Sequence, residues 1–337
     1  MSGGPSPGPR FTVGAGESGR IDLILAARFP GVGRRRWAAL FAAGAVEVDG
    51  ARARKGDRVG PGAEVALREA PATGDALAPV AQPELALDLL HTGARLVAMC
   101  KPAGMPSHPL RAGETGTLAN ALVARFPECA AAGGDPREAG LVHRLDRGTS
   151  GAMVAARDPE AWHELRRAFS AGEVDKRYLA LVAGAAADGA CDTPLRPAGR
   201  RALLASPDER GALPAATQWR AIASGPGLTL LAVRARTGRM HQVRAHLAAC
   251  GAPLVGDPLY GGPGELALPD GERIAVALPF LHAARLDLPL PGKGAERLVV
   301  RAPLAADRVA LLARAGVNID LDGGGDGDGA GELRSSR

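Results

Sequence analysis

An alanine- and proline-rich stretch at residues 71–90 constrains the organisation of this chain more than any other feature of its sequence. A stretch of this composition is typical of a linker between folding units. The chain has 337 residues, which is enough for two domains. We therefore expect a small unit at residues 16–70 and a larger one at residues 91–315.

The composition is that of an ordinary globular protein with a basic balance. Apolar residues make up 46% and charged residues 23% of the chain, and the formal net charge is +5. The basic excess favours an acidic partner, although clustering of Lys and Arg matters more than the total. The first ten residues lack the apolar core of a signal peptide, and no apolar run approaches a membrane span. We expect a cytoplasmic protein with no membrane partner.

The four cysteines lie far apart and form no Cys-x-x-Cys pair, which argues against a zinc ribbon or a thioredoxin-type site. Both ends of the chain are rich in Gly with little to bury, so we expect a disordered leader at residues 1–15 and a disordered tail at residues 316–337. The Asp and Gly residues of the tail lack the ligand spacing of a calcium loop.

Residues 16–70 carry the pattern of two short helices followed by a strand. The first helix has apolar Ile21, Leu23, Ile24 and Ala27, and the second has Trp37, Leu40 and Phe41 before Gly44. Val46 and Val48 alternate with polar residues, as in a strand with one buried face.

The same unit holds a dense group of basic side chains. Between residues 34 and 58 there are seven basic and three acidic residues, and the basic group opens with Arg34, Arg35 and Arg36. A solvated helix face would explain this group without any ligand. However, GRIDLILAARFP, the basic residues that follow and GAVEVDG together resemble the S-four-like, or αL, RNA-binding domain. That resemblance implies that Arg34, Arg35 and Arg36 bind RNA.

The larger unit mixes short strands with amphipathic helices. Asp158 and Gly172 bound one predicted helix, with Pro159 in its first turn and an apolar stripe between them. An alternating strand follows at residues 175–183. Because no regular strand and helix alternation and no phosphate-binding glycine loop occur, we predict an α+β fold and not a doubly wound one.

Two segments contain side chains that are typical of an active site. LVHRLDRGTSG places Asp146 before a glycine-containing turn, where a carboxylate commonly bonds to neighbouring backbone amides. RTGRMHQVRAHL holds Arg239, His241 and Arg244 in a region, residues 228–256, without any acidic residue. Such a patch should attract phosphate, helped by a helix that begins near Met240. An amphipathic helix with Val243, Leu247 and Cys250 inward would be the structural alternative.

Two further segments have plain structural alternatives as well. Lys101 follows an apolar strand and precedes a proline-shaped turn in AMCKPAGMP. Tyr178, on the predicted strand DKRYLALV, could be a core residue with a bonded hydroxyl.

Together these four segments strongly resemble the RluA family of pseudouridine synthases, over most of residues 17–300. HRLD with TSG matches the family's catalytic motif, and KPAG, KRYLALV, TGRMHQVRAHL with GDPLYG, and LHAARLDLPLP follow in the family's order. Met240 stands where the family often has Thr, which leaves the assignment intact. The resemblance implies a mixed, largely antiparallel sheet with flanking helices. It also implies that Asp146, Tyr178 and Arg244 are catalytic.

The implied reaction breaks the bond between uracil and ribose and rejoins the base through carbon, without a cofactor or a metal. Asp146 acts as nucleophile or as electrostatic stabiliser, and the route of attack stays open. Arg244 pairs with it and Tyr178 lies against the uracil. The target nucleotide must be extruded from its stack, and Arg144 is the candidate to fill the vacated space. We assign Lys101, Arg239, His241 and Gln242 to RNA binding.

The expected partner is RNA, with ribosomal RNA favoured over tRNA, and the expected state is a monomer. A noncatalytic RNA-binding or ribosome-assembly factor on the same fold is the alternative function, although Asp146, Tyr178 and Arg244 are all intact. A metal-dependent phosphodiesterase using His143, Asp146 and His241 is a second rival. His241 and His246 are five residues apart on a helix, about 140° around its axis, and so would not chelate one ion as an i, i+4 pair can.

Overall fold

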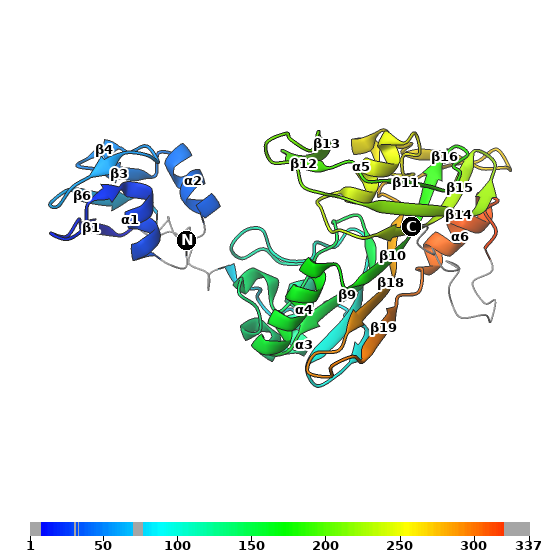
Figure 1. The fold of residues 1–337 in the computed structure, drawn as a ribbon, viewed down its shortest axis with the longest axis horizontal. Coiled ribbons are helices and arrows are strands. Elements are labelled where there is room, and N and C mark those ends of the chain that lie inside the picture. The colour runs from blue at the N-terminus through cyan, green and yellow to red at the C-terminus, as the bar shows by residue number, and fades with distance from the viewer. Residues whose placement is uncertain (1–7, 30–31, 33, 70–76, 320–337) are drawn as a thin grey trace. The chain divides into compact units, whose positions relative to one another are not determined.

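The structure, a computed structural model, describes residues 8–29, 32, 34–69 and 77–319. It consists of two compact units, the first within residues 8–80 and the second from Ala81 onward (Figure 1). The side chains of Arg34, Arg35 and Arg36 lie outside the described part, as does the alanine-rich segment 70–76.

The N-terminal unit packs two helices against a small antiparallel sheet. The sheet order is β1-β6-β3-β4, and β2 pairs with β5. The elements are β1 (Arg10–Thr12), β2 (Gly19–Arg20), α1 (Ile21–Arg28), α2 (Arg34–Ala42), β3 (Val46–Val48), β4 (Ala51–Arg52), β5 (Arg58–Val59) and β6 (Glu64–Leu67).

The core of this unit follows the predicted helices with two exceptions. Ile21, Ile24 and Leu25 of α1 pack with Trp37 and Leu40 of α2 in a single buried cluster. Ala27, which we expected on the apolar face, is exposed. Leu23, expected there as well, is 62% exposed. The helical period explains this, since Leu25 and not Leu23 follows Ile21 by one turn.

The predicted disordered leader is wrong over its last residues. Arg10, Phe11 and Thr12 form β1, which pairs with β6 along the register Arg10 to Ala66. Phe11 also packs against the core, so even a short strand here has apolar surface to bury. Residues 1–7 lie outside the described residues.

The C-terminal unit is built on one mixed, largely antiparallel sheet. Its order is β11-β14-β15-β10-β18-β9-β8-β7, with β19 also paired to β18, and β18 runs parallel to β9. These strands are β7 (Asp88–Thr92), β8 (Leu96–Lys101), β9 (Ser150–Ala156), β10 (Asp175–Ala183), β11 (Gly189–Cys191), β14 (Thr217–Gly225), β15 (Leu228–Ala235), β18 (Leu281–Pro289) and β19 (Arg297–Arg301). The predicted α+β class is confirmed.

Two hairpins and the helices complete this unit. The hairpins are β12 (Leu195–Ala198) with β13 (Arg201–Leu204), and β16 (Glu265–Ala267) with β17 (Arg273–Ala275). The helices are α3 (Leu118–Arg125), α4 (Pro159–Ala171), α5 (Gln242–Ala249) and α6 (Ala306–Arg314), with short 3-10 turns η2 (Pro127–Ala131), η3 (Pro136–Glu138) and η4 (Pro258–Tyr260).

The alternation of side chains along each strand sends successive residues to opposite faces, and the helices cover both faces. Val97 and Met99 of β8 pack with α3, whereas Leu96 and Ala98 pack with α4. In the same way, one face of β10 and β15 packs with α5 and the other with α6. Tyr178 packs against both the α3 cluster and the α5 cluster, so these two helices flank the face that carries it.

The helix bounded by Asp158 and Gly172 is confirmed. Asp158 accepts a hydrogen bond from the Ala161 amide, and Gly172 ends the helix with a φ of 74°. Two predicted boundaries are wrong. Asp88 already begins β7, inside the expected linker, and Val317, inside the expected tail, is buried in the α6 cluster. In the described part of the chain, no helix is long and apolar enough to span a membrane.

Candidate active site

Asp146 lies on the loop that enters β9, and the glycines after it allow the chain to turn tightly. The Thr149 amide donates to the Asp146 carbonyl at 3.0 Å and closes the turn. Gly151 has a φ of 117°, and a Cβ there would lie 2.3 Å from the Ala283 carbonyl oxygen of β18. Only glycine permits this approach of β9 to β18. The TSG sequence is therefore needed to join the Asp146 loop to the sheet.

Lys101 supports the same loop through its side chain. Its predicted role in RNA binding is wrong. The side chain is completely buried. Its Nζ donates to the carbonyls of Pro102, Met105 and Arg147 at 2.9, 2.7 and 3.2 Å. Burial lowers the pKa of Lys101 to about 7, and the Asp146 charge opposes that shift. Because three carbonyls each need a donor, the ammonium is the form that this contact set requires.

Arg244, on α5, brings a buried guanidinium to Asp146. Its Nη1 donates to Asp146 Oδ2 at 3.1 Å, which confirms the predicted pairing of these two side chains. Burial acts to lower the pKa of Arg244, but the bonds and charge of Asp257, with the charge of Asp146, raise it above its ordinary value. The arginine is therefore a fixed positive charge against the carboxylate.

Asp257 was missed as a site residue, although it belongs to the GDPLYG segment. It accepts from Arg244 Nε at 2.7 Å and from Nη2 at 2.8 Å, and it is almost wholly buried. A bidentate pair of this kind fixes the plane of the guanidinium. Residues 228–256 contain several arginines and no acidic residue, so no carboxylate within that segment can pair with them. Asp257, the first acidic residue after the segment, was the signal for such a partner.

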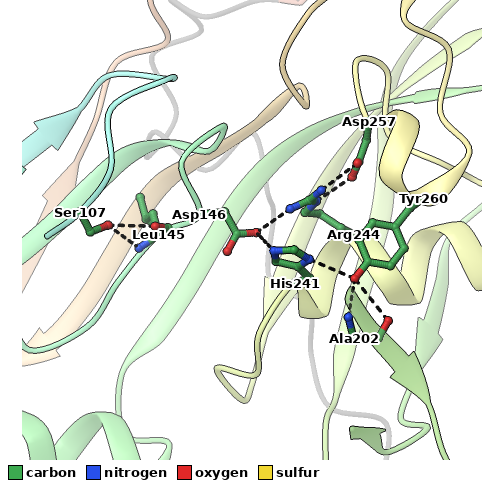
Figure 2. A network of polar contacts seen from close by, with 8 residues as sticks. All are labelled: Ser107, Leu145, Asp146, Ala202, His241, Arg244, Asp257 and Tyr260. Atoms are coloured by element: carbon green, nitrogen blue, oxygen red, sulfur yellow. Dashed lines mark hydrogen bonds and ion pairs between the residues drawn. The ribbon is translucent and has the colours of Figure 1, made fainter. Parts of the chain in front are cut away.

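Tyr260 and His241 extend the network on the same side of Asp146 as Arg244 (Figure 2). His241 Nε2 lies 3.7 Å from Asp146 Oδ2, and His241 Nδ1 lies 3.0 Å from the Tyr260 hydroxyl. The Tyr260 oxygen also accepts from the Ala202 amide of β13 at 2.7 Å. The Arg244 guanidinium stacks on the Tyr260 ring at 5.1 Å.

The second carboxylate oxygen of Asp146 is left available. Oδ1 has no hydrogen-bond partner among the residues that the structure describes, and Figure 2 shows it pointing away from Arg244 and His241. The Asp146 side chain is 24% exposed. A ligand can therefore reach Oδ1 of Asp146, while Oδ2 is held in place by Arg244.

Tyr178, on β10, lies near Asp146. Burial, and then the charge of Asp146, raise the pKa of Tyr178 well above its usual range. Its cross-strand neighbours are Val233 on β15 and Ala283 on β18, and Ala283 in turn pairs with Gly151. Within the described chain the Tyr178 hydroxyl makes no hydrogen bond, and the residue is half-buried between the α3 and α5 clusters.

The predicted RNA-binding role of Gln242 is wrong. Its amide donates to the Ala216 carbonyl and the Thr217 hydroxyl at 2.9 and 3.0 Å. Its oxygen accepts from Thr237 Oγ1 and from the Arg239 amide at 2.6 and 3.0 Å. The side chain is buried and its hydrogen-bonding capacity is used, so it fixes the start of α5 instead.

The remaining predicted residues lie in varied settings. Arg144 is exposed, next to Asp146 in the chain, whereas Arg239 donates from Nε to the Pro214 carbonyl. His143 faces away toward β9 and α4, because its Nε2 accepts from the Val154 amide and its ring stacks on Phe169. Those contacts argue against a metal site shared with Asp146 and His241. His246 is buried between Thr193 and Thr217, and Cys250 is exposed and not inward.

Comparison with known proteins decides the family. Residues 95–249 match the family model of RNA pseudouridylate synthase. A protein of Xanthomonas campestris named ribosomal large subunit pseudouridine synthase D is 36% identical over 304 residues, covering 87% of this chain and 88% of that protein. The chain belongs to the RluA family of RNA pseudouridine synthases. It is thus an isomerase, as the resemblance implied.

Other relatives agree with this family and fold. An uncharacterised RNA pseudouridine synthase of Chloroflexus aurantiacus is 39% identical, over 86% of this chain and 87% of its own length. The structure of human RNA pseudouridylate synthase domain containing 4 superposes with a TM-score of 0.55 at 24% identity. It covers 69% of this chain and 94% of the human one. This last likeness supports the fold of the synthase unit.

Proposed function

We propose that this pseudouridine synthase isomerises uridines of large-subunit ribosomal RNA, with Asp146, Arg244 and Tyr178 as its reacting set. One observation carries the assignment of the site: Arg244 bonds one oxygen of Asp146, with His241 3.7 Å from that oxygen, and the other oxygen is free. Relatives named ribosomal large subunit pseudouridine synthase D support the choice of RNA. A monomer in the cytoplasm fits this function.

In this proposal Asp146 works as a carboxylate throughout. Arg244 favours the charged form because a contact with a fixed positive charge stabilises it. Oδ1 then faces the sugar or base of the extruded uridine, as nucleophile or as stabiliser of the detached base. The bond from N1 of uracil to the ribose breaks, the base turns, and its carbon 5 bonds to the ribose.

Tyr178 serves this sequence as a platform and as a proton-handling group. Its ring, on the strand beside the Asp146 loop, can lie against the uracil. After rejoining, carbon 5 must lose its proton. A phenol with a raised pKa is neutral and a weak base, so stacking is the firmer of the two roles.

The grip on RNA comes from basic side chains of both units. The exposed Arg144 is the candidate to occupy the space that the flipped nucleotide leaves. Arg239 and the basic residues at 34–58, in a unit proposed to be S-four-like, contact the phosphate backbone.

The test is Asp146→Asn, assayed on total RNA from cells that lack this protein. We expect no pseudouridine formation by nucleoside chromatography and nearly unchanged RNA affinity, because the amide keeps the shape but not the charge. The exposed Asp208→Asn is the matched control and should retain turnover. Turnover by a clean Asp146→Asn protein would remove Asp146 from the reaction. Mapping the modified positions would test the choice of ribosomal RNA.

A further inference from the structure

Polar contacts link Asp146 to the β12–β13 hairpin. They run from the Ala202 backbone through the Tyr260 hydroxyl and the His241 ring to the carboxylate (Figure 2). These groups come from β13, η4, the residue before α5 and the loop before β9. Segments far apart in sequence therefore converge on one oxygen of Asp146.

The direction of each hydrogen bond can be assigned from its partners. The Ala202 amide can only donate, so the Tyr260 oxygen accepts from it at 2.7 Å. The Tyr260 proton then has two acceptors, His241 Nδ1 at 3.0 Å and the Ala202 carbonyl at 3.3 Å. The shorter contact favours Nδ1.

A histidine that accepts at Nδ1 carries its proton on Nε2. That nitrogen faces Asp146 Oδ2, which as a carboxylate oxygen can only accept. The 3.7 Å separation is longer than a hydrogen bond, and contacts of this kind commonly tighten when substrate binds. Every donor in the chain thus points toward Asp146, an arrangement in which successive bonds strengthen one another.

Charged groups of both signs face His241. Asp146 and Asp257 are the carboxylates near it, and Arg244 and Arg144 the guanidinium groups. Asp146 acts most strongly among these charges, and because its Oδ2 lies 3.7 Å from Nε2, it favours a proton on that nitrogen. The hydroxyl of Tyr260 acts in the same direction from the other side of the ring, because a donor to Nδ1 also leaves the proton on Nε2.

We propose that Tyr260 is a positioning residue that sets the Nε2–H tautomer of His241, so that His241 fixes Oδ2 of Asp146 and leaves Oδ1 for the substrate. The backbone of His241 supports this, because its φ of 54° places the residue in the left-handed region. A non-glycine residue is held there only when its surroundings over-determine it. This inference rests on the proposed function for its effect on turnover.

The first test reads the tautomer without turnover. In the full chain labelled with ¹⁵N-histidine, ring nitrogen shifts at about pH 8, well above the ordinary histidine pKa, should show the Nε2–H form for His241. Tyr260→Phe should shift His241 toward the other tautomer while keeping the ring under Arg244. A His241→Gln sample assigns the signal. An Nδ1–H form in the wild type, or an unchanged form in Tyr260→Phe, would overturn the proposal.

The second test separates positioning from a structural role. Tyr260→Phe should lower kcat about 2- to 10-fold, the value of one hydrogen bond, with little change in KM. His241→Gln keeps an amide donor near the Nε2 position but makes it independent of Tyr260. Adding Tyr260→Phe to His241→Gln should then cost nothing further. Additive losses, or unchanged kcat in Tyr260→Phe, would overturn the proposal, whereas turnover in Asp146→Asn would instead overturn the proposed function.

Discussion

Asp257 holds Arg244 through two hydrogen bonds, at 2.7 and 2.8 Å, and Nη1 of the same guanidinium reaches Asp146 at 3.1 Å. The two carboxylates have different roles because their exposures differ. Asp257 has 1% of its side chain exposed and Asp146 has 24%. The buried carboxylate orients the arginine, and the accessible one has an oxygen open to a ligand.

Replacing Asp257 with Asn should damage both the fold and the reaction. One partner of a buried ion pair would be lost, which typically costs about 3–5 kcal/mol. We expect a lower free energy of unfolding in denaturant titrations and a large fall in kcat. Glu265→Gln, which removes the partner of the exposed Arg273, is the control and should cost less than about 1 kcal/mol. Equal stability of the Asp257→Asn and wild-type proteins would contradict this role of Asp257.

Lys101→Met should act as a stability variant and not as an RNA-binding variant. The methionine fills much of the space but leaves the carbonyls of Pro102, Met105 and Arg147 without their donor. Each unsatisfied buried group costs about 1–3 kcal/mol. We expect a lower thermal midpoint and an unchanged salt dependence of RNA binding. A weaker salt dependence at unchanged stability would return Lys101 to the RNA contact set.

The sequence predicted the parts of the fold that depend on local pattern. The Asp158 and Gly172 caps bounded α4, and alternation located β10 at residues 175–183. The resemblance to the RluA family also predicted that Arg244 pairs with Asp146, since both residues lie in specific motifs. Lys101 and Gln242 were assigned wrongly because burial depends on tertiary packing. A lysine before a turn looks the same in a sequence whether it faces water or three carbonyls.

Asp257 and Tyr260 show a second kind of limit. Their motif was recognised, but only the folded chain reveals that the carboxylate turns to Arg244 and the hydroxyl to His241. Short terminal elements were missed for another reason. β1 has three residues, and its pairing with β6 spans about fifty positions that local pattern does not connect.

Acid should destabilise the fold through His143. Burial lowers its pKa to about 3, from an ordinary value near 6.5. Below pH 6.5 the unfolded chain gains a proton at His143 that the folded chain does not bind. The free energy of unfolding therefore decreases as the pH is lowered, until the pH reaches the pKa of His143 in the folded chain. The limiting slope is about 1.4 kcal/mol per pH unit.

His143→Gln should flatten that slope, as measured by denaturant unfolding at a series of pH values. Glutamine can still accept from the Val154 amide but does not titrate. The exposed His163→Gln is the matched control and should keep the wild-type slope. If both variants follow the wild-type curve, His143 does not contribute to the acid sensitivity.

Tyr178→Phe should separate the ring from the hydroxyl. The hydroxyl has no partner in the described part of the chain, so its loss leaves the fold intact, and the ring can still stack. If the phenol handles the carbon 5 proton, kcat should fall by about 10²-fold or more at nearly unchanged KM. Single-turnover kinetics on a modified-site RNA fragment measure this. Wild-type kcat would leave the ring as the sole contribution of Tyr178.

The basic opening of α2 should contribute to RNA affinity through phosphate contacts. A triple change of Arg34, Arg35 and Arg36 to Gln removes three charges without touching the reacting set. We expect weaker RNA binding at low salt. The slope of log affinity against log salt concentration should become smaller in magnitude by about 2 to 3, because each lost phosphate contact removes about 0.7–0.9 from that slope. Turnover at saturating RNA should stay near the wild-type value.

A matched control decides whether position or total charge matters. It carries the same loss of charge in the C-terminal unit, at the exposed residues Arg273, Arg301 and Arg314. The salt slope of this control should remain close to that of the wild type. Equal slopes for the two triple variants would assign the effect to net charge alone. An unchanged slope in the α2 variant would count against RNA binding by this helix.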